Sequence, residues 1–170
     1  MGATLFLFGY AFLSNVALAV VPHEPVVIWY GAHLGVVTTA LVATAGTVAA
    51  AWTDHRLFAS SISRLTQHAA ASRSAPSVAL RWFARAPFAV LALSGVTPLP
   101  FFPFKVLAFA AAYPRGRYLA AVAAGRLPRY LLLAWLGMTV RLPPWALAAA
   151  GVLLLLPTLR LFRCATPNAN

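Results

Sequence analysis

The sequence has very few acidic residues and little charge of either sign. Of its 170 residues, 9% are charged, and the only acids are Glu24 and Asp54. A soluble domain carries roughly 25% charged residues, so this composition excludes an ordinary soluble fold and predicts an integral membrane protein. Two acids are too few for a dedicated metal cage, and the four histidines lack the close spacing of a zinc site. We therefore expect no metal and no other cofactor.

The sequence also lacks the motifs of common enzymes. It has a single cysteine, Cys164, which excludes a disulfide framework and a redox pair. It contains no Gly-x-Ser-x-Gly elbow, Walker loop or cysteine–histidine couple. These absences predict that the protein is not an enzyme.

Apolar residues and arginines dominate what is present. Hydrophobic residues make up 62% of the chain, and 13 Lys and Arg give a formal net charge of +11. The arginines stand at the ends of apolar runs rather than along a polar face, which disfavours nucleic acid as a partner. Such placement is typical of cytoplasmic anchors that contact anionic lipid headgroups. We expect a single membrane domain with membrane lipids as its partners.

The apolar runs divide the chain into membrane segments. Residues 3–34 are expected to form a first hairpin with Glu24 near its tip, or a pair of spans. The remaining boundaries predict a transmembrane helix at 35–53, a basic cytoplasmic loop at 54–85, and transmembrane helices at 118–138 and 144–162. Apolar residues at near-helical spacing favour an amphipathic helix in the first half of the loop.

Residues 86–112 are expected to form a second hairpin. Two apolar arms are separated by Pro98, Pro100 and Pro103, with Lys105 just beyond. Prolines at that density cannot continue a helix, because each lacks an N–H and clashes with the preceding turn. If this segment crossed the bilayer, the arginines that follow it would lie on the other side of the membrane from the five arginines of the basic loop at 54–85. The positive-inside bias therefore favours a re-entrant segment.

The two hairpins share a faint internal repeat. Pro22 and Pro25 are spaced like Pro100 and Pro103, and Gly46 and Gly125 follow them in similar alanine-rich runs. Two hairpins entering from opposite faces would make an inverted repeat, an architecture common among transporters. A chance match between alanine-rich runs is the alternative.

Charged residues inside the apolar runs are the candidate site. An ionised side chain near the bilayer centre costs ~2.5–3.5 kcal/mol even on the lenient insertion scale, so such residues usually have a partner or a function. Glu24 is a candidate protonatable gate or a partner for Lys105 or Arg126. Asp54 is a second candidate, expected to pair with Arg126 or Arg129. The alternative for Glu24 is an interfacial position on a short loop between spans, and for Asp54 an interfacial position at the end of a span.

Three cations are candidate ligands of a lipid phosphate. Arg126 and Arg129 are three residues apart and lie on one helix face. A guanidinium forks onto phosphate oxygens, so these arginines, with Lys105, are the candidate phosphate ligands. The alternative is that the arginines snorkel to the cytoplasmic interface.

The order of these motifs resembles the DedA/VTT-domain family of membrane proteins, also called SNARE-associated Golgi proteins. The resemblance covers roughly residues 14–138. In the first hairpin it rests on Pro22-His23-Glu24-Pro25 followed by a Gly-containing run, and Glu24 and Asp54 match the family's two functional acids. In the second half it rests on 97–100, Phe104-Lys105, 125–129 and Gly137. Many members carry an arginine just before the second tip, where this chain has Ser94-Gly95 and Lys105 is the candidate replacement.

The resemblance implies a fold and a function. It implies an all-α membrane protein with transmembrane helices and two opposed re-entrant hairpins around a hydrophilic cavity. It implies movement of a phospholipid or undecaprenyl phosphate between leaflets, coupled to protons in some bacterial members. We expect a multi-pass protein of the bacterial inner membrane, and a homo-oligomer is compatible with this. The alternative is a non-catalytic scaffold that maintains envelope integrity. The expected structural residues of the hairpin tips are Pro22, Pro25, Pro98, Pro100, Pro103 and Gly125.

Overall fold

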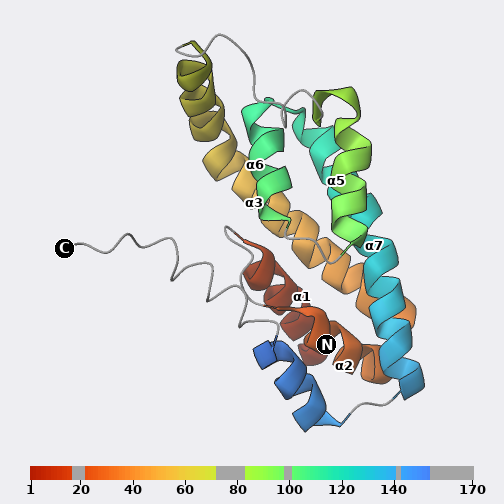
Figure 1. The fold of residues 1–170 in the computed structure, drawn as a ribbon. Coiled ribbons are helices and arrows are strands. Elements are labelled where there is room, and N and C mark those ends of the chain that lie inside the picture. The colour runs from red at the N-terminus through yellow and green to blue at the C-terminus, as the bar shows by residue number, and fades with distance from the viewer. Residues whose placement is uncertain (17–21, 72–82, 98–100, 141–142, 154–170) are drawn as a thin grey trace, which may run out of the picture.

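The computed structural model describes residues 1–16, 22–71, 83–97, 101–140 and 143–153. Within these ranges the regular structure is entirely helical, as expected, with no strand (Figure 1). Pro98 and Pro100 of the predicted second tip, residues 72–82 of the predicted loop, and residues 154–162 of the last predicted span lie outside the described residues.

Two helices, α1 (Gly2–Asn15) and α2 (Glu24–Leu34), form the first helical hairpin. Pro25 lies in the first turn of α2, where its missing N–H leaves no helical bond unmade. The helix ends at Gly35, whose φ of 83° is readily adopted only by a residue without a side chain. The boundary predicted between residues 34 and 35 is therefore where the chain turns from α2 into the next helix.

The third helix, α3 (Val36–Ala71), is longer than the predicted span and continues through Asp54. No proline or glycine lies between Gly46 and Ala71, so nothing in the backbone ends the helix at the acid. The first part of the basic segment at 54–85 is consequently helical, where an amphipathic helix was predicted, and it continues α3 rather than forming a separate helix. Its continuity with α3 places Asp54 inside a helix rather than at its end.

A second helical hairpin is formed by α5 (Pro87–Val96) and α6 (Phe102–Ala110). The chain leaves α5 at Thr97 in an extended conformation, as expected for a residue that precedes a proline. Pro103 lies in the first turn of α6. Both hairpins thus begin their second helix with a proline, in the position where proline is compatible with a helix.

The last long helix, α7 (Arg115–Val140), is continuous, with Pro128 inside it. A shorter apolar helix, Pro144–Leu153, follows. By length and composition alone, α7 and the Val36–Arg64 part of α3 can cross a membrane.

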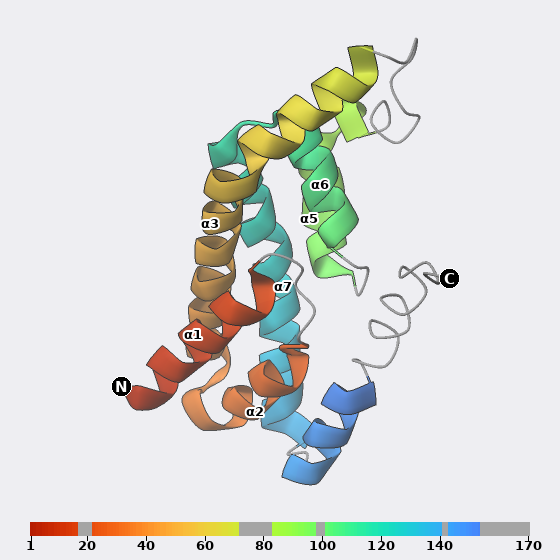
Figure 2. The same ribbon diagram turned by 90° about the vertical axis from the view of Figure 1, so that its left-hand side faces the viewer.

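The two hairpins lie at opposite ends of the long helices α3 and α7 (Figures 1 and 2). The end of α1 and the start of α2 face the end of α5 and the start of α6 near the middle of the molecule (Figure 2). The first helix of each hairpin packs on the long helix that follows it, α1 on α3 and α5 on α7. The second helix packs on the other long helix, α2 on α7 and α6 on α3.

Glycines allow the equivalent helices to approach closely. A Cβ at Gly46 would lie 2.6 Å from the carbonyl oxygen of Phe8 in α1, and a Cβ at Gly125 would collide with the backbone of Ala92 in α5. The two glycines of the predicted repeat therefore perform the same packing task in the two halves. Each hairpin also has its own apolar core, one around Leu7, Val27 and Ala134, the other around Leu91, Phe109 and Val122.

Candidate functional site

Arg129 of α7 joins the tips of both hairpins. One guanidinium nitrogen, Nη2, donates to Oε1 of Glu24 at 2.7 Å, and the other, Nη1, donates to the carbonyl oxygen of Thr97 at 2.6 Å. Glu24 is the first residue of α2, and Thr97 follows the last residue of α5. A single forked cation thus connects the two helix breaks to one long helix.

A second ion pair connects the second hairpin to α3. Nζ of Lys105 lies 2.6 Å from Oδ2 of Asp54 and donates a further hydrogen bond to the carbonyl oxygen of Asn15 at 3.3 Å. Asp54 is 0% exposed and Lys105 is 4% exposed, so the pair is fully buried. Since Asn15 ends α1, this pair also ties the two hairpin tips together.

Arg126 lies between Lys105 and Arg129 in the sequence, but unlike them it forms no ion pair with either acid among the described residues. The residue is 5% exposed, and its guanidinium carbon lies 5.2 Å from the ring centroid of Phe101. Its Nε has no hydrogen-bond partner among the described residues, whose two acids are bonded to Arg129 and Lys105. The hydroxyl of Tyr118, on the same helix, is likewise buried without a hydrogen-bond partner there. A buried guanidinium edge of this kind is suited to bind an anion.

A chain of hydrogen bonds runs beside the charges. Nε2 of His23 lies 2.9 Å from the hydroxyl of Tyr130, which lies 2.8 Å from Oγ1 of Thr47. His23 also lies 3.9 Å from Glu24. The chain therefore links the first hairpin tip to α3 through α7, and each hydroxyl can either donate or accept.

The structure changes the partners that were expected for the two acids. Glu24 pairs with Arg129 rather than with Lys105 or Arg126, and Asp54 pairs with Lys105 rather than with an arginine. The reason for the second change is distance along α3. Asp54 lies two turns, about 10 Å, beyond Thr47, which contacts α7 near Tyr130. It lies instead beside α6.

The other predicted residues that the structure describes lie at the hairpin tips or close to them. Pro25 and Pro103 lie in the first turns of α2 and α6, Pro22 accepts a hydrogen bond from the Tyr10 hydroxyl at 3.1 Å, and Gly125 contacts α5. His23, Tyr130 and Thr47 were not predicted. The available signal was the spacing of Tyr130 four residues after Arg126, which places both on one face of α7.

Within the described ranges, no three His, Cys, Asp or Glu side chains come together as metal ligands do. The polar side chains of the site instead form ion pairs and hydrogen bonds with one another, and Arg126 supplies the one guanidinium edge described above. Comparison with protein-family models, curated proteins and solved structures finds no match for this chain.

Proposed function

We propose that this chain is a multi-pass membrane protein that moves a phosphate-bearing lipid between leaflets, with Arg126 as the main phosphate ligand. Two long apolar helices support the membrane placement, with the two helical hairpins entering the bilayer from opposite faces as re-entrant segments. The resemblance to the DedA/VTT-domain family supports the bacterial inner membrane as the location. The lipid is a phospholipid or undecaprenyl phosphate.

The observation that carries the proposal is the charge balance of the cluster at the hairpin tips, in which Asp54, Lys105 and Arg126 are buried and the Glu24–Arg129 pair is partly buried. Its three cations, Lys105, Arg126 and Arg129, face two acids, so the cluster has one net positive charge apart from His23. Each acid pairs with a cation other than Arg126. A buried charge without a counter-ion is costly in a membrane, so the cluster favours an anionic ligand at Arg126. A lipid phosphate supplies both the negative charge and the oxygens that a guanidinium binds.

The position of the cluster explains how a headgroup would pass. Irregular backbone at membrane depth is tolerated where it is buried in protein or lines a polar cavity, and both helix breaks lie at the cluster. A headgroup that reaches Arg126 from either face would cross only a short apolar barrier on each side. Its hydrocarbon tails would remain in the bilayer.

The acids give a route for protons to act on this step. Protonation of Glu24 would remove the charge that holds Nη2 of Arg129, now at 2.7 Å, and would loosen the link between the two tips. The proton would therefore favour an open state of one hairpin. A Glu24→Gln variant mimics the protonated acid and is expected to lose proton dependence.

A leaflet-exchange assay tests the proposal. Proteoliposomes would carry a phospholipid with a dithionite-sensitive fluorophore, and the fraction quenched would be followed over time. We expect quenching beyond the outer-leaflet half for the natural sequence, and at least a tenfold slower inner-leaflet phase for Arg126→Ala. Arg117→Ala is the matched control, because the same substitution on the same helix changes an exposed arginine.

The outcomes separate transport from a structural role. Quenching that stops at half, with and without a proton gradient, would overturn transport of the labelled lipid. A repeat with a labelled polyprenyl phosphate extends the test to the second lipid class. Equal exchange by Arg126→Ala and the natural sequence would overturn the role of Arg126. A cell that lacks the protein could lose envelope integrity. If Arg126→Ala and Arg117→Ala then restore that integrity equally, the result would favour the scaffold alternative.

A further inference from the structure

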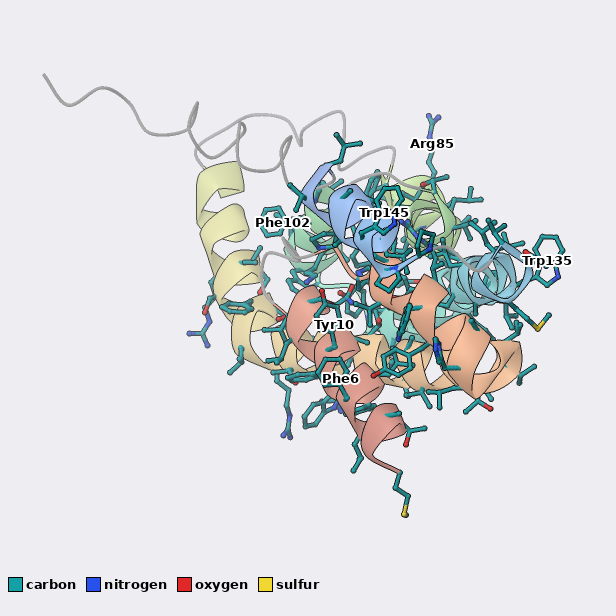
Figure 3. The ribbon with its side chains drawn as sticks, turned by 90° about the horizontal axis from the view of Figure 1, so that it is seen from below. Phe6, Tyr10, Arg85, Phe102, Trp135 and Trp145 are labelled. Atoms are coloured by element: carbon teal, nitrogen blue, oxygen red, sulfur yellow. The ribbon has the colours of Figure 1, made fainter. Side chains whose placement is uncertain are left out.

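A cavity of about 490 Å³ lies beside the first hairpin, and none of the charged residues of the cluster is among its described lining residues. Its walls come from α1, α2 and the helix Pro144–Leu153, which Figure 3 shows from below with Phe6 and Tyr10 labelled on α1. The volume falls within the ~300–1,000 Å³ typical of small-molecule sites.

The walls of the cavity are aromatic and aliphatic. Phe6, Trp29 and Tyr30 line it from the hairpin, and Leu147 and Val152 line it from the last helix. No charged side chain is among the described residues that line it. The hydroxyl of Tyr10 is directed to the carbonyl oxygen of Pro22, 3.1 Å away, rather than left for a ligand. This lining suits a hydrocarbon.

One end of the cavity adjoins the charged cluster. Pro22 and Pro25 line the cavity, and the residue between them that faces the cluster is Glu24, the partner of Arg129. Arg126 lies one helical turn before Arg129 on α7. A ligand with its apolar part in the cavity would therefore have its polar end at the hairpin tip.

We propose that the cavity holds one hydrocarbon chain of the phosphate-bearing lipid whose phosphate binds at Arg126. This inference rests on the proposed function and adds a tail site to it. The protein would thus recognise its lipid at both ends, a single chain by the aromatic walls and the phosphate by the guanidinium. A fatty acyl chain and an isoprenoid chain share this chemistry, and the test separates them.

Photochemical labelling tests the tail site directly. The full chain in lipid nanodiscs would be irradiated with phosphatidic acid, or with farnesyl phosphate, each carrying a diazirine midway along one chain. Labelled peptides would be located by mass spectrometry. We expect labelling of the segments that contain Trp29 and Leu147 to saturate and to be displaced by unlabelled lipid. Labelling of exposed residues of α7, such as Leu132, is expected to be non-saturable.

Two variants fill the cavity, and one neighbour serves as the control. Ala148→Phe places a ring inside the cavity, whereas Ala149→Phe changes an exposed neighbour outside its lining. Gly151→Leu is a second filling variant, since a Cβ there makes only an ordinary 3.6 Å contact with Pro25. Both filling variants are expected to reduce saturable labelling at least tenfold, and Ala149→Phe to leave it unchanged. The probe that labels more strongly identifies the chain as acyl or isoprenoid.

Two results would overturn the tail site. Equal labelling of Ala148→Phe, Gly151→Leu and Ala149→Phe would show that the cavity holds no lipid chain. Labelling that arises only after removal of residues 154–170 would assign the cavity to the protein's own C-terminal segment. The leaflet-exchange assay keeps the two proposals apart. If Arg126→Ala slows leaflet exchange and Ala148→Phe does not, the proposed function is retained without the tail site. If the natural sequence shows no exchange, the proposed function itself is overturned.

Discussion

Asp54 and Lys105 form the most deeply buried ion pair among the described residues, with 2.6 Å between Nζ and Oδ2. Removing one partner of a buried pair leaves a charge without its counter-ion, which typically costs ~3–5 kcal/mol. We expect Asp54→Ala to lower the free energy of unfolding by about that amount, measured by denaturant titration in detergent. The double variant Asp54→Ala/Lys105→Ala should recover part of the loss, because no charge is then stranded. A double variant no more stable than Asp54→Ala alone would contradict this account.

Arg129 is a second residue whose geometry makes a sharp prediction. Its two terminal nitrogens bind different groups, the Glu24 carboxylate and the Thr97 carbonyl, at 2.7 and 2.6 Å. Lysine keeps the charge but has one compact ammonium in place of the planar fork. Arg129→Lys should therefore lose one charge-assisted hydrogen bond, with a destabilisation of ~1.5–3 kcal/mol. The thermal midpoint in detergent measures this, with Arg117→Lys as the exposed control. An unchanged midpoint would show that the forked contact contributes nothing.

The charged residues of the site could be selected from the sequence, but their partners could not. Glu24, Asp54, Lys105, Arg126 and Arg129 stand out because each interrupts an apolar run, and all five lie at or near the meeting point of the hairpin tips. Pairing depends on the rotation and length of helices. Asp54 pairs with Lys105 because α3 continues past the acid and places it beside α6. No local signal in the sequence gives the rotation of α7, which turns Arg126 inward and Arg129 toward Glu24.

At the scale of helices, backbone contacts at glycines hold the hairpins against the long helices. A Cβ at Gly125 would collide with Ala92, and a Cβ at Gly137 would collide with Ile28. Close backbone approach at small residues is a common basis of helix packing in membranes. The sequence indicated Gly125 through its repeat with Gly46, because equivalent helices need equivalent gaps. Pro25 and Pro103 were predicted only as tip residues, and the structure places them in the first turns of α2 and α6, the position that proline favours in a helix.

These contacts predict opposite effects for chemically identical substitutions. Gly125→Ala and Gly137→Ala should destabilise the protein by ~1–3 kcal/mol, because the extra methyl group forces two backbones apart. Gly9→Ala and Gly116→Ala meet nothing within 4 Å and should be neutral or stabilising by up to ~1 kcal/mol, since alanine favours helix. Thermal midpoints of the four variants test this. Similar midpoints for all four would contradict the close packing of α5 on α7 and of α2 on α7.

At the scale of the whole molecule, the described charges are distributed in two zones. Lys105, Arg126 and Arg129 lie at the middle, where the hairpin tips meet. Of the other five described cations, four lie on segments at the end where α3 finishes and α5 and α7 begin (Figure 2): Arg64, Arg85, Arg115 and Arg117. The fifth, Arg56, lies on α3 between Asp54 and that end. No described Lys or Arg lies at the opposite end, where α1 begins and α2 finishes. The resulting asymmetry has the form that the positive-inside rule requires.

This asymmetry predicts how the protein is oriented in a membrane. The arginine-rich end should face the cytoplasm, so that the second hairpin enters from the cytoplasm and the first from the opposite face. Cys164→Ser removes the single native thiol, and Gly116→Cys and Ala32→Cys then place one exposed thiol at each end. A membrane-impermeant maleimide applied to spheroplasts should label the Ala32→Cys variant and not the Gly116→Cys variant, and inside-out vesicles should reverse the result. Labelling of both variants from the same face would contradict α3 and α7 as spans, because each of these helices connects the two ends that carry the thiols.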